Sequence, residues 1–145
     1  GAQTDHNRSE IEDAAREFRR RGLPVDNFVQ DWKYWGSQGW SPVWDEALYP
    51  DPAGMVAELH DDYHVRFMVS VWSKFENAAF LEPLREGGEL LKRTIWMDAY
   101  DPQAKEDFFA FANASMFSIG VDALWLDATE PENLCRLFDG WGAWL

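Results

Sequence analysis

The sequence predicts an α/β protein in which parallel strands alternate with helices. Strand-like apolar runs alternate along the chain with amphipathic helical runs, and the strand-like runs end on polar or aromatic residues. Strands that are separated by helical crossovers pair in parallel. A chain of 145 residues is long enough to bury the core of one domain, so we expect residues 1–145 to form a single domain.

The first helix and the first strand are expected near the N-terminus. Residues 1–8 are polar, and we expect them to be disordered or to be a remnant of an expression tag. Ser9 and Glu12 match a capping box, which predicts that a helix starts at Ser9. Gly22 ends this helix, and residues 25–32 predict a strand.

A long loop and the clearest strand follow. Residues 34–50 are rich in Gly, Ser, Pro and Trp, and a loop of this length is often functional. Asp51 and Pro52 predict the capped start of a second helix. Residues 65–72 are mostly β-branched or aromatic and predict a strand. We expect most of the loop's large aromatic residues to pack the loop itself: Tyr34, Trp35, Trp40 and Trp44.

The remaining elements continue the alternation. Pro83 predicts either a kink in the third helix or a later start of that helix. The elements expected in this part are a helix over residues 78–86, a short strand or extended arm over 94–97, a helix capped by Asp101, a strand over 121–126, and a last short helix with an apolar tail over 134–145.

Composition limits the classes of partner. The net charge is -13, from 13 basic and 26 acidic residues, which argues against nucleic acid and anionic membranes as partners. His6, His60 and His64 lack the spacing of metal ligands, so we expect neither a metal nor a cofactor. Cys135 is the single cysteine, so no disulfide forms within the chain, and the compartment is left undetermined. No apolar run is long enough to span a membrane, and no signal peptide is visible.

Polar and aromatic side chains follow the ends of three expected strands. Because the carboxyl ends of parallel strands share one edge of a sheet, these side chains converge there. Carboxylates accept hydrogen bonds from sugar hydroxyls, and indole rings cover the apolar face of a sugar. The candidate site residues are Asp31, Trp32, Trp72, Lys74, Asp127 and Glu130.

Each candidate also has a purely structural interpretation. Asp127 is equally well placed to cap a following helix, with Glu130 in solvent. Trp32 and Trp72 are as readily explained by packing as by ligand contact, and Lys74 by simple exposure.

Four segments of the chain carry motifs that occur together in one enzyme family. Residues 125–130 fit the pattern W-x-D-x-x-E. This pattern resembles the signature of family 31 glycoside hydrolases, and residues 126–132 resemble the family's α-xylosidase branch. The other three segments occur in the family's order, at residues 28–36, which resemble V-x-D-W-x-Y-W-G, and at residues 49–56 and 69–75. The resemblance covers roughly residues 9–133, most of the chain, and implies a (β/α)8 barrel of the TIM type.

The resemblance implies a retaining α-glycosidase that acts on an α-linked xyloside or glucoside. Asp127 then matches the nucleophile that forms the glycosyl-enzyme intermediate, and Glu130 supports it. Asp31 matches the aspartate that holds sugar hydroxyls. The remaining residues implied to line the same pocket are Trp32, Trp72 and Lys74.

The chain departs from the family pattern in three ways. A retaining glycosidase needs a second carboxyl group about 5 Å from the nucleophile as acid/base. In the family this aspartate lies downstream on a later strand's loop, and no motif in this chain matches it. A complete barrel takes about 250 residues, so the chain corresponds to about half of one, without the strand expected before the first helix. Ser73 stands where the α-xylosidase pattern usually has proline.

Three hypotheses follow from these observations. The first is a segment of a retaining α-glycosidase that carries the nucleophile but lacks the usual acid/base. The second is a non-catalytic half-barrel, natural or engineered, that self-associates or pairs with a complementary barrel half. Half a barrel leaves its inner sheet face uncovered, so we expect apolar residues within 65–71 to be exposed and to favour association. The third is a sugar-binding module.

Overall fold

The structure, a computed structural model, describes residues 7–128 and contains one three-stranded parallel sheet. Its strands are β1 (Asn27–Gln30), β2 (Arg66–Val71) and β3 (Ala123–Leu126), with β2 in the centre. Both pairings are parallel, with Gln30 beside Val69 and Val71 beside Leu126. The prediction of parallel strands with helical crossovers is therefore confirmed.

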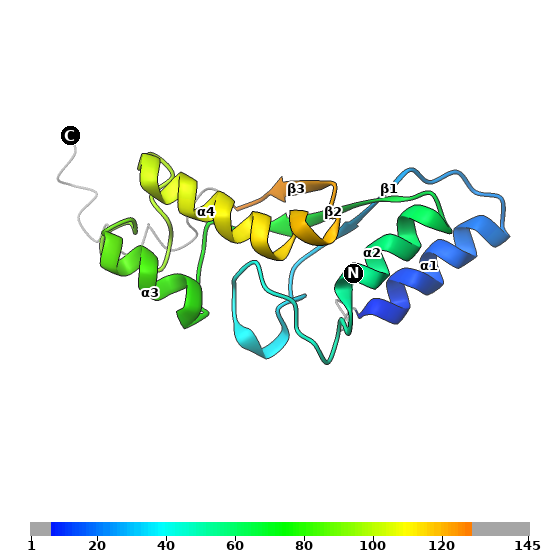
Figure 1. Ribbon diagram of the computed structural model, residues 1–145, viewed down its shortest axis with the longest axis horizontal. Coiled ribbons are helices and arrows are strands. Elements are labelled where there is room, and N and C mark those ends of the chain that lie inside the picture. Colours follow the sequence, from blue (N-terminus) through cyan, green and yellow to red (C-terminus); the bar gives the residue numbers. More distant parts are fainter. Residues whose placement is uncertain (1–6, 129–145) are drawn as a thin grey trace, which may run out of the picture.

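Helices pack beside the sheet and beyond its carboxyl end. Figure 1 shows α1 and α2 side by side next to β1 and β2, α4 along β3, and α3 beyond the ends at which β2 and β3 stop. No helix in the described residues is both long and apolar enough to cross a membrane. The helical elements are α1 (Arg8–Arg20), η1 (Gly36–Gln38), α2 (Pro52–Asp61), α3 (Ala78–Gly87), α4 (Pro102–Ser115) and η2 (Phe117–Ile119).

The first helix starts earlier than the capping box predicts. Asn7 is the N-cap, and its Oδ1 accepts a hydrogen bond from the Glu10 backbone N–H at 3.2 Å. Ser9 lies inside the first turn instead of capping it, so this part of the prediction was wrong. The reason is tertiary: the Arg8 N–H donates to the Leu48 carbonyl at 3.0 Å, which fixes the chain one residue before Ser9.

The predicted aspartate caps of α2 and α4 are confirmed. Asp51 Oδ1 accepts from the Gly54 N–H at 3.0 Å, and Asp101 Oδ1 accepts from the Gln103 N–H at 2.7 Å. A proline follows each cap at the first helical position, where its missing N–H costs nothing. Pro83 does not cause a later start of α3. The helix begins at Ala78, is capped by Asn77, and continues through the proline.

The core lies between the sheet and the helices. The β2 side chains of Phe67, Val69 and Val71 are buried, and they belong to one apolar cluster with buried residues of the helices. The helix residues in this cluster are Ala15 of α1, Met55, Val56 and Leu59 of α2, Leu81 and Leu84 of α3, and Ala104 and Phe108 of α4.

The other face of the sheet is open at its two outer strands. Val29 of β1 is 45% exposed and Trp125 of β3 is 54% exposed, whereas Met68 between them is half-buried. The expectation of exposed apolar residues within 65–71 was largely wrong. In a strand, alternate side chains point to opposite faces, and the helices already cover most of the apolar ones on β2.

Candidate active site

The three strand ends meet at one edge of the sheet. The Asp127 N–H donates to the Val71 carbonyl at 3.0 Å, which extends the β2–β3 pairing by one residue and sets Asp127 beside Trp72. Continuing the β1–β2 register sets Asp31 beside Ser70. The two aspartates therefore flank the central strand, from opposite sides of it, at the carboxyl edge.

Asp127 presents an exposed carboxylate at this edge. Its Oδ1 accepts a hydrogen bond from the Ala128 N–H at 2.8 Å, and Ala128 has a φ of +44°, outside the range of an extended strand. The side chain is solvent-exposed, so a ligand reaches the carboxylate without disrupting buried contacts. Glu130, its expected supporting residue, lies outside the described residues.

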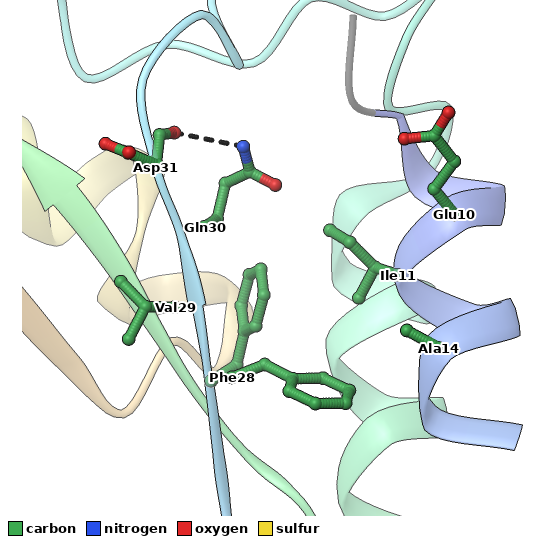
Figure 2. A pocket seen from close by; sticks show the side chains of 8 residues that line it. Glu10, Ile11, Ala14, Phe28, Val29, Gln30 and Asp31 are labelled. Atoms are coloured by element: carbon green, nitrogen blue, oxygen red, sulfur yellow. Dashed lines mark hydrogen bonds between the residues drawn. The ribbon is translucent and has the colours of Figure 1, made fainter. Parts of the chain in front are cut away.

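Asp31 is exposed in the same way. Its Oδ1 accepts from the Trp32 N–H at 2.8 Å, and its carbonyl accepts from Gln30 Nε2 at 3.0 Å. Figure 2 shows the Asp31 carboxylate and Val29 on the side of β1 away from α1, whereas Gln30 points toward α1. A cavity of about 220 Å³ lies between α1 and β1, lined by Ile11, Ala14, Phe28 and Gln30 among others.

Four tryptophans form a stack along the carboxyl edge, which we call the indole stack: Trp32, Trp40, Trp72 and Trp96. Ring centroids are 5.7 Å apart for Trp32–Trp40, 3.9 Å for Trp40–Trp72 and 5.9 Å for Trp72–Trp96. The ring planes of successive pairs differ by 22° to 28°. Both candidate tryptophans, Trp32 and Trp72, are half-buried members of this stack.

Lys74 is held against the stack. Its Nζ lies 3.0 Å from Glu76 Oε1 and 5.1 Å from the centre of the Trp40 ring. Its side chain is only 16% exposed, which excludes the simple reading of Lys74 as a solvated lysine. Trp96 reaches the stack from the arm, where it forms an isolated bridge with Lys74.

Sequence reasoning missed two members of this site. Tyr34, Trp35 and Trp44 are buried, as expected for packing residues of the loop, but Trp40 is half-buried and stacks on Trp72. Glu76 was not considered at all. The available signal was Gly39: a side chain there would place its Cβ 2.8 Å from Glu76 Cβ, so the glycine marks a close approach before Trp40.

The amino edge of the sheet carries a different carboxylate. Asp122 accepts hydrogen bonds from the Phe67 N–H at 2.8 Å and from Arg66 at 2.8 Å, and it pairs with His60 Nε2 at 2.7 Å. Burial alone would raise the pKa of Asp122, but the bonds from Phe67, His60 and Arg66 together lower it. No group of three or more potential ligands among residues 7–128 is arranged to hold a metal ion.

Comparison with known proteins shows which family and which class of fold the chain matches. The sequence matches the model described as "Glycosyl hydrolases family 31 TIM-barrel domain" over residues 2–143. With its parallel sheet and helical crossovers, the structure is a partial α/β barrel. The chain belongs to glycoside hydrolase family 31.

The similar proteins include several α-xylosidases. The chain is 33% identical to an "Alpha-xylosidase" of Saccharolobus solfataricus over 85% of its own length and 17% of the relative's. The crystal structure of a family 31 α-xylosidase from Xanthomonas citri has a TM-score of 0.81 at 32% identity, over 89% of this chain and 16% of that one. A soil-metagenome α-xylosidase, solved in complex with xylose, has a TM-score of 0.77 at 29% identity, over 88% of this chain and 21% of that one. The chain thus spans about a fifth of the length of these relatives.

Proposed function

We propose that this chain is the part of a retaining α-glycoside hydrolase, of α-xylosidase type, that carries the catalytic nucleophile Asp127. The observation that carries the proposal is an exposed carboxylate at the carboxyl end of β3, within the W-x-D-x-x-E signature. Similarity to α-xylosidases, one of them solved with xylose, supports an α-xyloside as the substrate, with an α-glucoside as the alternative.

In the proposed reaction Asp127 attacks the anomeric carbon of the sugar. The new carboxylate–carbon bond replaces the bond to the leaving group, and water then hydrolyses the glycosyl-enzyme intermediate. A second carboxyl group about 5 Å away must protonate the leaving oxygen and later deprotonate the water. We propose that this acid/base comes from outside residues 1–145, either from a continuation of the same polypeptide or from a complementary chain.

The other site residues bind the sugar in this proposal. Asp31 accepts hydrogen bonds from sugar hydroxyls, and its exposed carboxylate needs no rearrangement to do so. Trp32 and Trp72 supply apolar ring surface, while Lys74 donates to the sugar from its position beside the indole stack. Glu130 orients Asp127.

Covalent labelling tests the nucleophile. We expect a fluorinated α-xylosyl fluoride to modify Asp127, identified by peptide mass, because an activated leaving group needs little protonation. Asp127→Asn should abolish labelling, whereas Asp98→Asn, which removes a carboxylate from the arm, should leave it unchanged. Labelling of another residue while Asp127 stays unmodified would remove the assignment.

A second candidate function is assembly with another chain, either a second copy or a complementary barrel half. The open sheet face exposes Val29 and Trp125, and Leu126 of β3 and Phe109 of α4 are each 63% exposed. Leu126 and Phe109 also border an apolar cavity of about 280 Å³ next to Asp127. Exposed apolar surface of this kind favours association.

Sedimentation at several protein concentrations tests assembly. We expect the chain to sediment as a dimer, which Val29→Glu should dissociate because it places a charge in the contact. Glu46→Gln in the loop, also an exposed position, is the control. A monomer at high concentration would reject self-association.

A further inference from the structure

The indole stack poses a problem for sugar binding by Trp72. The Trp40 ring lies over Trp72 with centroids only 3.9 Å apart and planes 28° from parallel. The Trp72 indole nitrogen is buried, and it has no hydrogen-bond partner within the part of the chain that the structure describes. In this arrangement Trp72 offers neither a free ring face on that side nor its N–H to a ligand.

Trp40 occupies the position that a sugar ring takes when it stacks on an indole. The flat apolar face of a pyranose and the face of an aromatic ring cover Trp72 in the same way. Trp40 is also enclosed from further sides, by Trp32 at 5.7 Å and by Trp35 at 4.2 Å between ring centroids. An internal side chain and a sugar therefore compete for one surface.

Hydrogen bonds to the Trp40 backbone add to these ring contacts, and Ser41 Oγ donates one of them to the Trp40 carbonyl. The Glu76 N–H donates to the Trp40 carbonyl at 2.7 Å, and the Trp40 N–H donates to Glu76 Oε2 at 3.2 Å. The other oxygen of Glu76 pairs with Lys74 at 3.0 Å. The Glu76 side chain is 40% exposed, so water screens this pair and competes with its hydrogen bonds. We call these contacts between Glu76, Trp40 and Lys74 the Glu76 latch.

The backbone next to Trp40 contains two glycines with positive φ. Gly39 has φ of 80° and ψ of 167°, a conformation that is essentially restricted to glycine. Gly36, at the start of the same turn, has a φ of +54°. A Cβ at Gly36 would clash with the Asp45 carboxylate, and a Cβ at Gly39 would lie 2.8 Å from Glu76 Cβ, so glycine at both positions lets this segment pack closely against Asp45 and Glu76.

We propose that Trp40 is an internal occupant of the sugar position on Trp72, latched by Glu76, and that a pyranoside binds by displacing it. This inference rests on the proposed function, because it takes Trp72 as a sugar contact. Only molecules in which Trp40 has moved away from Trp72 can bind the sugar. The apparent dissociation constant is therefore the intrinsic one divided by the fraction of such molecules. Trp40 thus lowers the affinity of the site for every ligand that must displace it. Ligands that stack on Trp72 more strongly than the Trp40 ring does are favoured.

Xylose is the probe for this inference, with binding followed by calorimetry and by near-UV circular dichroism. Xylose should diminish the near-UV signal of the stacked indoles in proportion to saturation. Trp40→Ala should lack that signal and bind xylose roughly fivefold to tenfold more tightly, because an aromatic pair no longer competes.

Glu76→Gln tests the latch without removing an aromatic residue, so it does not depend on the folding of Trp40→Ala. It should reduce the near-UV signal before xylose is added and tighten xylose binding about twofold. The matched control is Glu82→Gln, which removes the same charge from a pair with Arg85 on α3 and should change neither quantity.

Two results would overturn the inference alone while leaving the sugar site intact. Weaker xylose binding by folded Trp40→Ala would make Trp40 a direct sugar contact, and an unchanged near-UV signal at xylose saturation would show that Trp40 stays in place. Absence of xylose binding by the wild type and by every variant would instead count against both the inference and the proposed sugar site.

Discussion

The two edges of the sheet use aspartate in opposite ways. At the amino edge Asp122 accepts from a backbone N–H and pairs with the side chains of His60 and Arg66, and its own side chain is 22% exposed. At the carboxyl edge Asp31 and Asp127 are exposed, and each accepts one hydrogen bond from the N–H of the next residue. A carboxylate surrounded by donors stabilises the fold, whereas an exposed one at a strand end has bonding capacity left for a ligand.

The largest effect on stability is expected at the amino edge. Asp122→Ala should lower the free energy of unfolding by about 2–3 kcal/mol, since the Phe67 N–H loses a charged acceptor and His60 and Arg66 lose their partner. Urea unfolding measures this change. A loss as small as that of an exposed aspartate would remove the contrast between the two edges.

Substitutions at the carboxyl edge should change ligand affinity instead of stability. In a form of the protein that binds xylose, Asp31→Ala should weaken binding by about 1–3 kcal/mol, because sugar hydroxyls lose a charged acceptor. Calorimetry measures the affinity, and Asp26→Ala at the other end of β1 serves as the control. Equal affinities for Asp31→Ala and the wild type would reject the assigned role.

The contributions of Glu89 and Asp122 to the free energy of unfolding should change with pH in opposite directions. Burial raises the pKa of Glu89, and the nearby Asp107, which hydrogen-bonds to it, and Asp101 raise it further. Its Oε2 is buried without a partner among the described residues. Glu89 lies where α3 meets the arm, beyond the carboxyl edge, and its carbonyl accepts from the Asp98 N–H at 2.8 Å.

The raised pKa of Glu89 means that the folded chain holds this proton more tightly than the unfolded chain. The stability it contributes is complete below the usual pKa of 4.5 and is lost as pH rises through the folded pKa. Asp122 behaves oppositely: its stabilisation is present above the usual pKa of 3.8 and is lost as pH falls through its lowered folded pKa.

Substitution of Glu89 isolates its contribution to the pH dependence of stability. Glu89→Gln, which stays neutral, should raise the free energy of unfolding at pH 8 by about 1 kcal/mol and leave it nearly unchanged at pH 4. Thermal unfolding across pH 4–8 measures this, with Glu86→Gln as an exposed control. Destabilisation by Glu89→Gln at pH 8 would show that the charged form is favoured in the fold.

The smallest effect is expected for the proposed nucleophile. Asp127→Ala should change the free energy of unfolding by no more than about 0.5 kcal/mol, as for other exposed positions, although it abolishes labelling. Measuring it beside Asp122→Ala in urea compares the two edges directly. A loss above 1 kcal/mol would mean that Asp127 stabilises the end of β3.

Features that depend on neighbouring residues were predictable from the sequence. Asp51 and Asp101 cap helices because an aspartate followed by proline satisfies the first turn locally. The strand over residues 65–72 follows from its own β-branched and aromatic composition. The family motifs place Asp127 at a strand end, which the structure confirms. The assigned catalytic and binding roles at this edge stay predictions.

The tertiary structure alone decided the features that join distant segments. Asn7 replaces Ser9 as the cap because Leu48 holds Arg8, and Glu76 exchanges hydrogen bonds with the Trp40 backbone from 36 residues away. The same holds for Asp107 beside Glu89 and for Phe67 beside Asp122. By itself the sequence determined the family, the order of the elements and the strand ends that carry carboxylates, since these depend on local patterns. Only folding decided which carboxylate is surrounded by hydrogen-bond donors, which carboxylate is exposed, and which tryptophan covers another. These features depend on contacts between distant segments, which local sequence patterns do not encode.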